Sequence, residues 1–103
     1  MVKNLYFLIV LLFSLHAVAA EDTGFNEICR IYTEAQNSSM LGQQLSTYIF
    51  DNVEQRVISK DARDAHDAIF QLDPTKRYEI FKQSAELALR HLWNCPAAKN
   101  LMH

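Results

Sequence analysis

Apolar residues recur along this chain at helical spacing, and the alternation typical of strands is missing from residues 21–103. An apolar side chain at every third or fourth position lies on one face of a helix. The pattern predicts four helices, over residues 23–36, 40–57, 60–71 and 74–94. Their short connections favour antiparallel neighbours. We therefore expect an all-α fold: a small four-helix bundle, or a three-helix core with the short third helix beside it.

The first two predicted helices each have one apolar face. On the first, this face consists of Phe25, Ile28, Cys29, Tyr32 and Ala35. On the second, the stripe consists of Leu41, Leu45, Tyr48, Ile49, Asn52, Val53 and Val57. Residues 37–39, Asn-Ser-Ser, separate the two helices and are expected to supply the N-cap of the second. Gly42 is expected to weaken its first turn by up to about 1 kcal/mol relative to alanine.

The last two predicted helices have the clearest start signals. Ser59 precedes the third, whose inner face consists of Ala62, Ala65, His66 and Ile69. Asp73 is expected to cap the fourth, with Pro74 in the first helical position. The core stripe of the fourth helix consists of Tyr78, Phe81, Ala85, Ala88, Leu89 and Leu92. We expect Asn94 to end this helix and Pro96 to prevent its continuation. Residues 96–103 then form a short C-terminal tail.

Residues 1–20 have the pattern of a signal peptide. Lys3 precedes an apolar run over residues 5–15, and small residues follow it at cleavage spacing, before the acidic Glu21. We expect cleavage before Glu21, or alternatively before Ala20. The apolar segment is shorter than the ~20 residues that a membrane-spanning helix needs. The prediction is therefore a leader over 1–20 and one helical domain over 21–103, located in the periplasm or secreted, without stable membrane insertion after cleavage.

The charge balance excludes two classes of partner. The whole chain has a formal net charge of −2, and loss of Lys3 with the leader makes the remainder more acidic. Binding to nucleic acid requires a basic surface, which this composition does not provide. A polybasic module for membrane surfaces is excluded for the same reason.

The chain has two cysteines, Cys29 and Cys95. An even count in a small exported chain is most simply explained by a disulfide, and here only one pairing is possible. Closing a loop of this length stabilises the fold by roughly 4 kcal/mol in the chain-entropy treatment. The absence of Cys-x-x-Cys spacing argues against a redox site.

Several short motifs resemble small secreted helical proteins of Gram-negative bacteria. These motifs are residues 28–30 (Ile-Cys-Arg), 77–82 (Arg-Tyr-Glu-Ile-Phe-Lys), 85–86 (Ala-Glu) and 93–97 (Trp-Asn-Cys-Pro-Ala). The related proteins pair an early cysteine with a late Trp-x-Cys-Pro. The resemblance implies export and a helical fold, and it brings no known activity.

Three groups of residues have the chemistry of a metal ligand set, and each has a simpler explanation. His66 lies near Asp64 and Asp67, but at spacings that do not bring them together on a helix, so we expect a partly buried histidine with a local hydrogen bond. The Asp61, Asp64 and Asp67 series has local partners in Lys60 and Arg63 at i,i+4. A third set, His91, Cys95 and His103, requires a free thiolate, which a disulfide would remove. We expect no metal and no cofactor.

No motif in the chain indicates catalysis. There is no marked nucleophile, no glycine run for phosphates, and the domain is too small to form the cleft that paired carboxylates need. Residues 37–39 match a glycosylation acceptor, but a helix cap explains them equally well. We therefore expect a protein that is not an enzyme.

Some apolar side chains lie off the predicted core faces and suggest a surface for binding. They are Phe50, Ile80, Leu87, His91, Leu101 and Met102. The function predicted from them is a non-catalytic protein-binding module, with another protein or its own copy as partner. One alternative is an immunity protein that inhibits a periplasmic toxin, and another is a carrier of a metal or small ligand.

Overall fold

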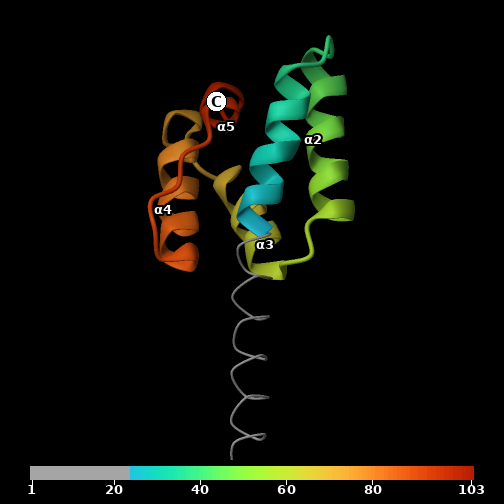
Figure 1. Cartoon of the computed structure of the whole chain (residues 1–103). Coiled ribbons are helices and arrows are strands. Elements are labelled where there is room, and N and C mark those ends of the chain that lie inside the picture. The colour runs from blue at the N-terminus through green and yellow to red at the C-terminus, as the bar shows by residue number, and fades with distance from the viewer. Residues whose placement is uncertain (1–23) are drawn as a thin grey trace, which may run out of the picture.

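The computed structural model describes residues 24–103, and the regular structure in this range is helical (Figure 1). The helices are residues 24–36, α2 (Gly42–Arg56), α3 (Lys60–Ile69), the 3₁₀ turn η1 (Pro74–Lys76), α4 (Arg77–Leu89) and α5 (Pro96–Leu101). This confirms the predicted all-α bundle with one disulfide. The predicted leader and its cleavage site lie outside the described residues.

Helix α3 contacts each of the longer helices. It packs against α4, and its His66 ring lies 5.6 Å from Tyr32 of the first helix and 5.2 Å from Phe50 of α2. The first helix and α2 lie side by side, with α4 across from them (Figure 1). Arg56 of α2 reaches the first helix through ion pairs of 2.7 Å with Glu27 and 2.6 Å with Glu34.

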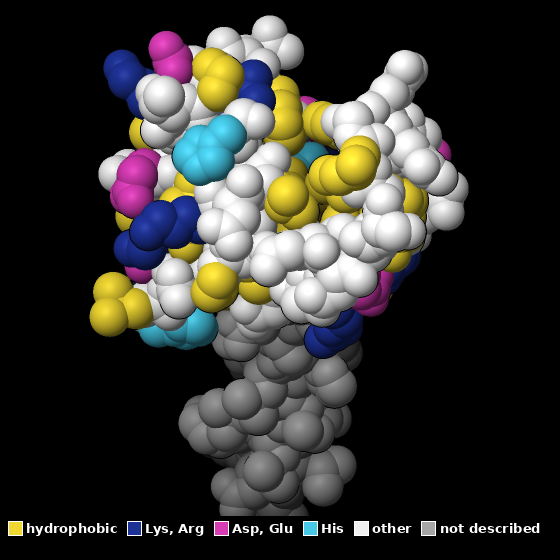
Figure 2. Space-filling view, turned by 90° about the horizontal axis from the view of Figure 1, so that it is seen from above, with side chains coloured by type: hydrophobic (Ala, Val, Ile, Leu, Met, Phe, Trp, Pro, Cys, Tyr) yellow, Lys and Arg dark blue, Asp and Glu magenta, His cyan; other side chains and the backbone are white. Residues whose placement is uncertain are grey.

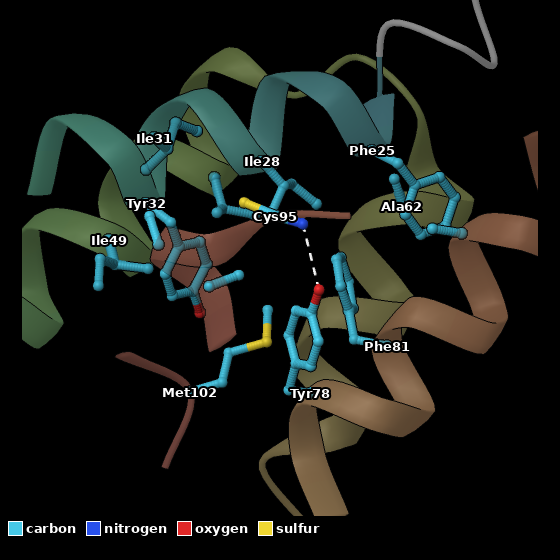
Figure 3. Close-up of a cluster of buried hydrophobic side chains, with 14 of the residues drawn as sticks. Phe25, Ile28, Ile31, Tyr32, Ile49, Ala62, Tyr78, Phe81, Cys95 and Met102 are labelled. Carbon is cyan, nitrogen blue, oxygen red and sulfur yellow. Dashed lines mark hydrogen bonds between the residues drawn. The ribbon is translucent and has the colours of Figure 1, made fainter. Parts of the chain in front are cut away.

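The core takes buried side chains from all the described α-helices, and in it the first helix, α4 and the C-terminal segment meet (Figure 3). The Phe25 and Phe81 rings lie 5.4 Å apart, and Phe81 also contacts Trp93 at 5.6 Å. The Tyr78 hydroxyl accepts a hydrogen bond of 3.1 Å from the Cys95 backbone N–H, drawn dashed in Figure 3. A buried backbone donor would be costly without a partner, so this bond anchors the segment that leads into α5.

The predicted caps at Ser59 and Asp73 are confirmed, although Asp73 caps a 3₁₀ turn and α4 itself begins only at Arg77. The Ser59 side chain accepts a hydrogen bond of 3.3 Å from the Ala62 backbone N–H at the start of α3. Asp73 accepts one of 3.0 Å from the Thr75 backbone N–H, and Pro74 occupies the first position of η1. Each cap is a local interaction, which explains why the sequence pattern was sufficient to predict it.

The predicted start of α2 is wrong by two residues. The helix begins at Gly42, whose φ is +59°, and its N-cap is Leu41, which makes no side-chain cap. Ser38 instead bonds the backbone of its own turn, donating to the Ala35 carbonyl at 2.6 Å and accepting from the Met40 N–H at 3.3 Å. Leu41 therefore precedes the helix and is 80% exposed, not part of the core stripe.

The predicted end of α4 is also wrong. The helix stops at Leu89, and Arg90 adopts a left-handed conformation with φ +59°, so Leu92 is 87% exposed and Trp93 is buried in its place. The Glu86 carboxylate accepts a hydrogen bond of 3.0 Å from the Trp93 backbone N–H, which requires the chain to turn back. Glu86 also pairs with Lys82 at 3.0 Å. Ala88, expected in the core, is exposed.

The C-terminal segment is a packed helix and not the predicted tail. Pro96 begins α5, and Ala97, Ala98 and Met102 are buried. Asn100 donates a hydrogen bond of 3.2 Å to Gln36 at the end of the first helix. The α5 segment therefore covers part of the core that the predicted four helices would leave open.

Candidate binding site

The predicted disulfide is present and determines what the cysteines can do. The Cys29 and Cys95 sulfur atoms are 2.10 Å apart, with Cα atoms 5.8 Å apart. The bond joins the first helix to the N-cap residue of α5. Because a metal ligand must be a thiolate, the bonded Cys95 cannot complete a site with His91 and His103.

No group of three or more His, Cys, Asp or Glu side chains within residues 24–103 is placed to hold a metal ion. Within the same residues, no helix combines the length and the apolar character that crossing a membrane requires.

His66 lies in the core, and the expectation of a partly buried ring with a local hydrogen bond is wrong. Its side chain is fully buried, and its Nε2 lies 2.6 Å from the Tyr32 hydroxyl of the first helix. Rings of Phe50, Phe70 and Phe81 surround it at 5.2, 5.1 and 6.1 Å. Burial lowers the pKa of His66 to about 4 and raises the pKa of Tyr32. This pair therefore belongs to the core and contacts no solvent.

The aspartate series on α3 only partly follows the predicted pairing. Lys60 and Asp64 form the expected i,i+4 ion pair at 2.6 Å. Arg63 does not bind Asp67. It donates to the backbone carbonyl groups of Val57 and Ile58 at 2.5 and 3.0 Å, because these end the preceding segment and lack helical donors.

The six side chains of the predicted interaction surface do not form one patch. Met102 is fully buried, so it cannot contribute to a surface, and Leu101 is half-buried. Phe50 is partly exposed but packs on Phe70, with ring centroids 4.8 Å apart. Ile80 is partly exposed on α4, Leu87 is 81% exposed, and His91 lies beyond the helix end, with its Nδ1 2.8 Å from the Leu92 carbonyl oxygen.

Leu87 lies at an open cavity between the start of α3 and the end of α4. We name it the α3–α4 cavity; its volume is about 230 Å³, and its lining residues are Phe25, Ser59, Asp61, Leu87, Ala88 and Arg90. Ile58, next to Ser59 in the chain, is 80% exposed. A cavity of this size exceeds the ~150 Å³ that accommodates a benzene molecule. The site can therefore receive one apolar side chain.

The walls of the α3–α4 cavity combine apolar and charged groups. Phe25, Leu87 and Ala88 supply the apolar surface, and Asp61 and Arg90 supply one charge of each sign. Within residues 24–103, neither Asp61 nor Arg90 forms an ion pair. Such opposite charges at an apolar opening can orient a partner through complementary charges.

The first described residue lies at the same end of the molecule. Gly24 is packed so closely on α3 that an added Cβ would lie 2.7 Å from the Ser59 Cβ and 3.0 Å from the Ala62 Cβ. The first helix starts beside the α2–α3 connection and the end of α4 (Figure 1). The connection after residue 36, which contains Leu41, lies at the opposite end of that helix.

Sequence reasoning identified Leu87 but missed the cavity around it. Ile58 and Leu92 were not recognised as exposed, and Leu92 was placed in the core stripe. The exposure of Leu92 follows from the left-handed Arg90, for which helical spacing carries no signal. The sequence does contain a signal for the exposure of Ile58. This residue directly precedes the predicted cap Ser59, and residues before a cap lie outside the helix.

Seen from above, hydrophobic side chains also gather in a hollow on another face of the molecule, with charged side chains toward its edges (Figure 2).

Comparison with family models, with curated proteins and with solved structures finds no match to this chain. The assignment of a function therefore depends on the chemistry of the sites described above.

Proposed function

We propose that this protein is a small exported helical module that binds a protein partner and catalyses no reaction. The observation that carries the proposal is the apolar side chain of Leu87, which lines the α3–α4 cavity and is 81% exposed. Exposed apolar side chains around a concave site are typical of a protein-binding surface.

Two features support export, either to the periplasm or out of the cell. Residues 1–20 have the charge and apolar pattern of a cleavable leader. The Cys29–Cys95 disulfide is a bond that persists in oxidising compartments such as the periplasm.

The placement of the reactive side chains supports a non-catalytic role. Both cysteines are bonded to each other, and the His66 ring is enclosed by the core. A catalytic base must come within hydrogen-bond distance of its substrate, and none of these three side chains is free to do so. The remaining exposed groups at the cavity suit recognition by charge and shape.

Site-specific photo-crosslinking in the exporting host tests the proposal. A photoreactive residue at Leu87 is expected to give covalent protein adducts, and Leu41 is a matched control because it is equally exposed at the far end of the first helix. An Ala88→Asp substitution in the cavity wall should reduce the adducts formed at position 87. Equal labelling from positions 87 and 41, or no adduct from either, would contradict a binding surface at this cavity.

A further inference from the structure

We infer that the partner at the α3–α4 cavity is a second copy of this chain, related by a two-fold axis, with Leu87 of each copy in the cavity of the other. This inference rests on the proposed function and specifies its partner. It is carried by the charges, the size and the apolar rim of one cavity.

The charge pattern of the cavity is self-complementary. In a two-fold interface, residue i faces residue j and residue j faces residue i. Asp61 and Arg90 line the same cavity, so Arg90 of one copy can pair with Asp61 of the other, and the reverse pair forms at the same time. A partner that carries charges of one sign only would satisfy one of these two residues, whereas a second copy satisfies both.

The apolar parts also match in size and position. Leu87 is both a lining residue and a projecting side chain, since it is 81% exposed. A leucine side chain fits a volume of about 230 Å³ beside Phe25 and Ala88. Docking would remove these side chains from water, which is the main favourable contribution to association.

Charge reversal combined with sedimentation velocity tests the inference. Protein purified as the host exports it is expected to shift from monomer toward dimer as its concentration rises. Asp61→Arg or Arg90→Asp alone places like charges opposite each other, and each should weaken the dimer about tenfold or more. The double variant Asp61→Arg/Arg90→Asp restores both pairs and should recover dimerisation.

Matched controls separate a lost interface from a damaged fold. Asp51→Arg on α2 and Lys99→Asp on α5 reverse exposed charges away from the cavity, and they should leave the dimer unchanged. Leu87→Asp should abolish the dimer, while Leu41→Asp should not. Circular dichroism and thermal melting confirm that each variant is folded; the rescue by the double reversal covers the case in which a single variant is unstable.

Two outcomes overturn the inference. A monomer at every concentration excludes the second copy, and so does a dimer that survives both single reversals and Leu87→Asp. If the protein is monomeric but position 87 still crosslinks to a different protein, the binding function stands and only the identity of the partner is wrong.

Discussion

The Tyr32 hydroxyl lies 2.6 Å from His66 Nε2 and joins the first helix to α3 through two buried side chains. The two residues are 34 positions apart in the chain. His66 Nδ1 has no partner within residues 24–103. The pair is therefore one of the few polar links inside an otherwise apolar core, and it makes the stability of the bundle sensitive to the protonation of one ring.

The free energy of unfolding is predicted to decrease as the pH is lowered, because His66 is buried. Burial lowers the folded-state pKa from 6.5 to about 4, so the unfolded chain binds this proton more readily. The contribution of His66 to the free energy of unfolding is complete above pH 6.5 and decreases as the pH falls toward 4. It amounts to about 3 kcal/mol in all. Urea unfolding at a series of pH values measures it. His66→Phe should show a smaller loss of stability between these limits; an identical pH profile would contradict the assignment.

Removal of the Tyr32 hydroxyl is predicted to destabilise the fold. Tyr32→Phe leaves His66 Nε2 without its hydrogen-bond partner in the core, which costs about 1–3 kcal/mol. Chemical denaturation at neutral pH gives the value. Tyr48→Phe is the matched control, because the Tyr48 hydroxyl bonds Glu34 at 3.0 Å on the surface and its loss should cost less. Equal effects of the two substitutions would show that burial of the Tyr32–His66 bond has no special weight.

The disulfide is predicted to contribute a large part of the total stability. Cys29→Ser should lower the free energy of unfolding by roughly 4 kcal/mol under non-reducing conditions, because the bond closes a loop with a sequence separation of 66. Small domains are stable by only about 5–15 kcal/mol. Thermal melting with and without reductant measures the effect. Reductant should destabilise the natural chain and leave the variant unchanged; an unaltered melting temperature in Cys29→Ser would contradict the prediction.

Met102 is predicted to act as a core residue although it is the penultimate residue of the chain. Met102→Ala removes a fully buried side chain and should destabilise by about 2–5 kcal/mol. Leu41→Ala serves as the control, because its side chain is 80% exposed and its truncation should change stability by less than about 0.5 kcal/mol. Denaturant titration compares the two. Similar small effects would indicate that α5 is not packed on the core.

Local signals in the sequence were sufficient for much of the fold. The helical spacing predicted the first helix, α2, α3 and α4, and the caps at Ser59 and Asp73 are formed by residues two or three positions away. The disulfide followed from having two cysteines in a chain whose first 20 residues have the pattern of an export leader. These features depend on neighbours in the chain or on counting, so the sequence contains the information directly.

The remaining features were decided by contacts between distant residues. Helical spacing continues past Leu89, but the bond from the Trp93 N–H to Glu86 and the packing of Trp93 on Phe81 favour a left-handed turn at Arg90. This turn exposes Leu92 and shapes the α3–α4 cavity, which Phe25 from the first helix completes.

The sequence by itself determined the class of fold, most of each helical face and the pairing of Cys29 with Cys95. Only the tertiary structure decided that Met102 is core, that Tyr32 bonds His66, and that Asp61 and Arg90 line one cavity with Leu87. The physical reason is that periodicity records which face of a helix is apolar. It does not record which distant residue that face meets, nor which apolar side chains remain uncovered once the helices have packed.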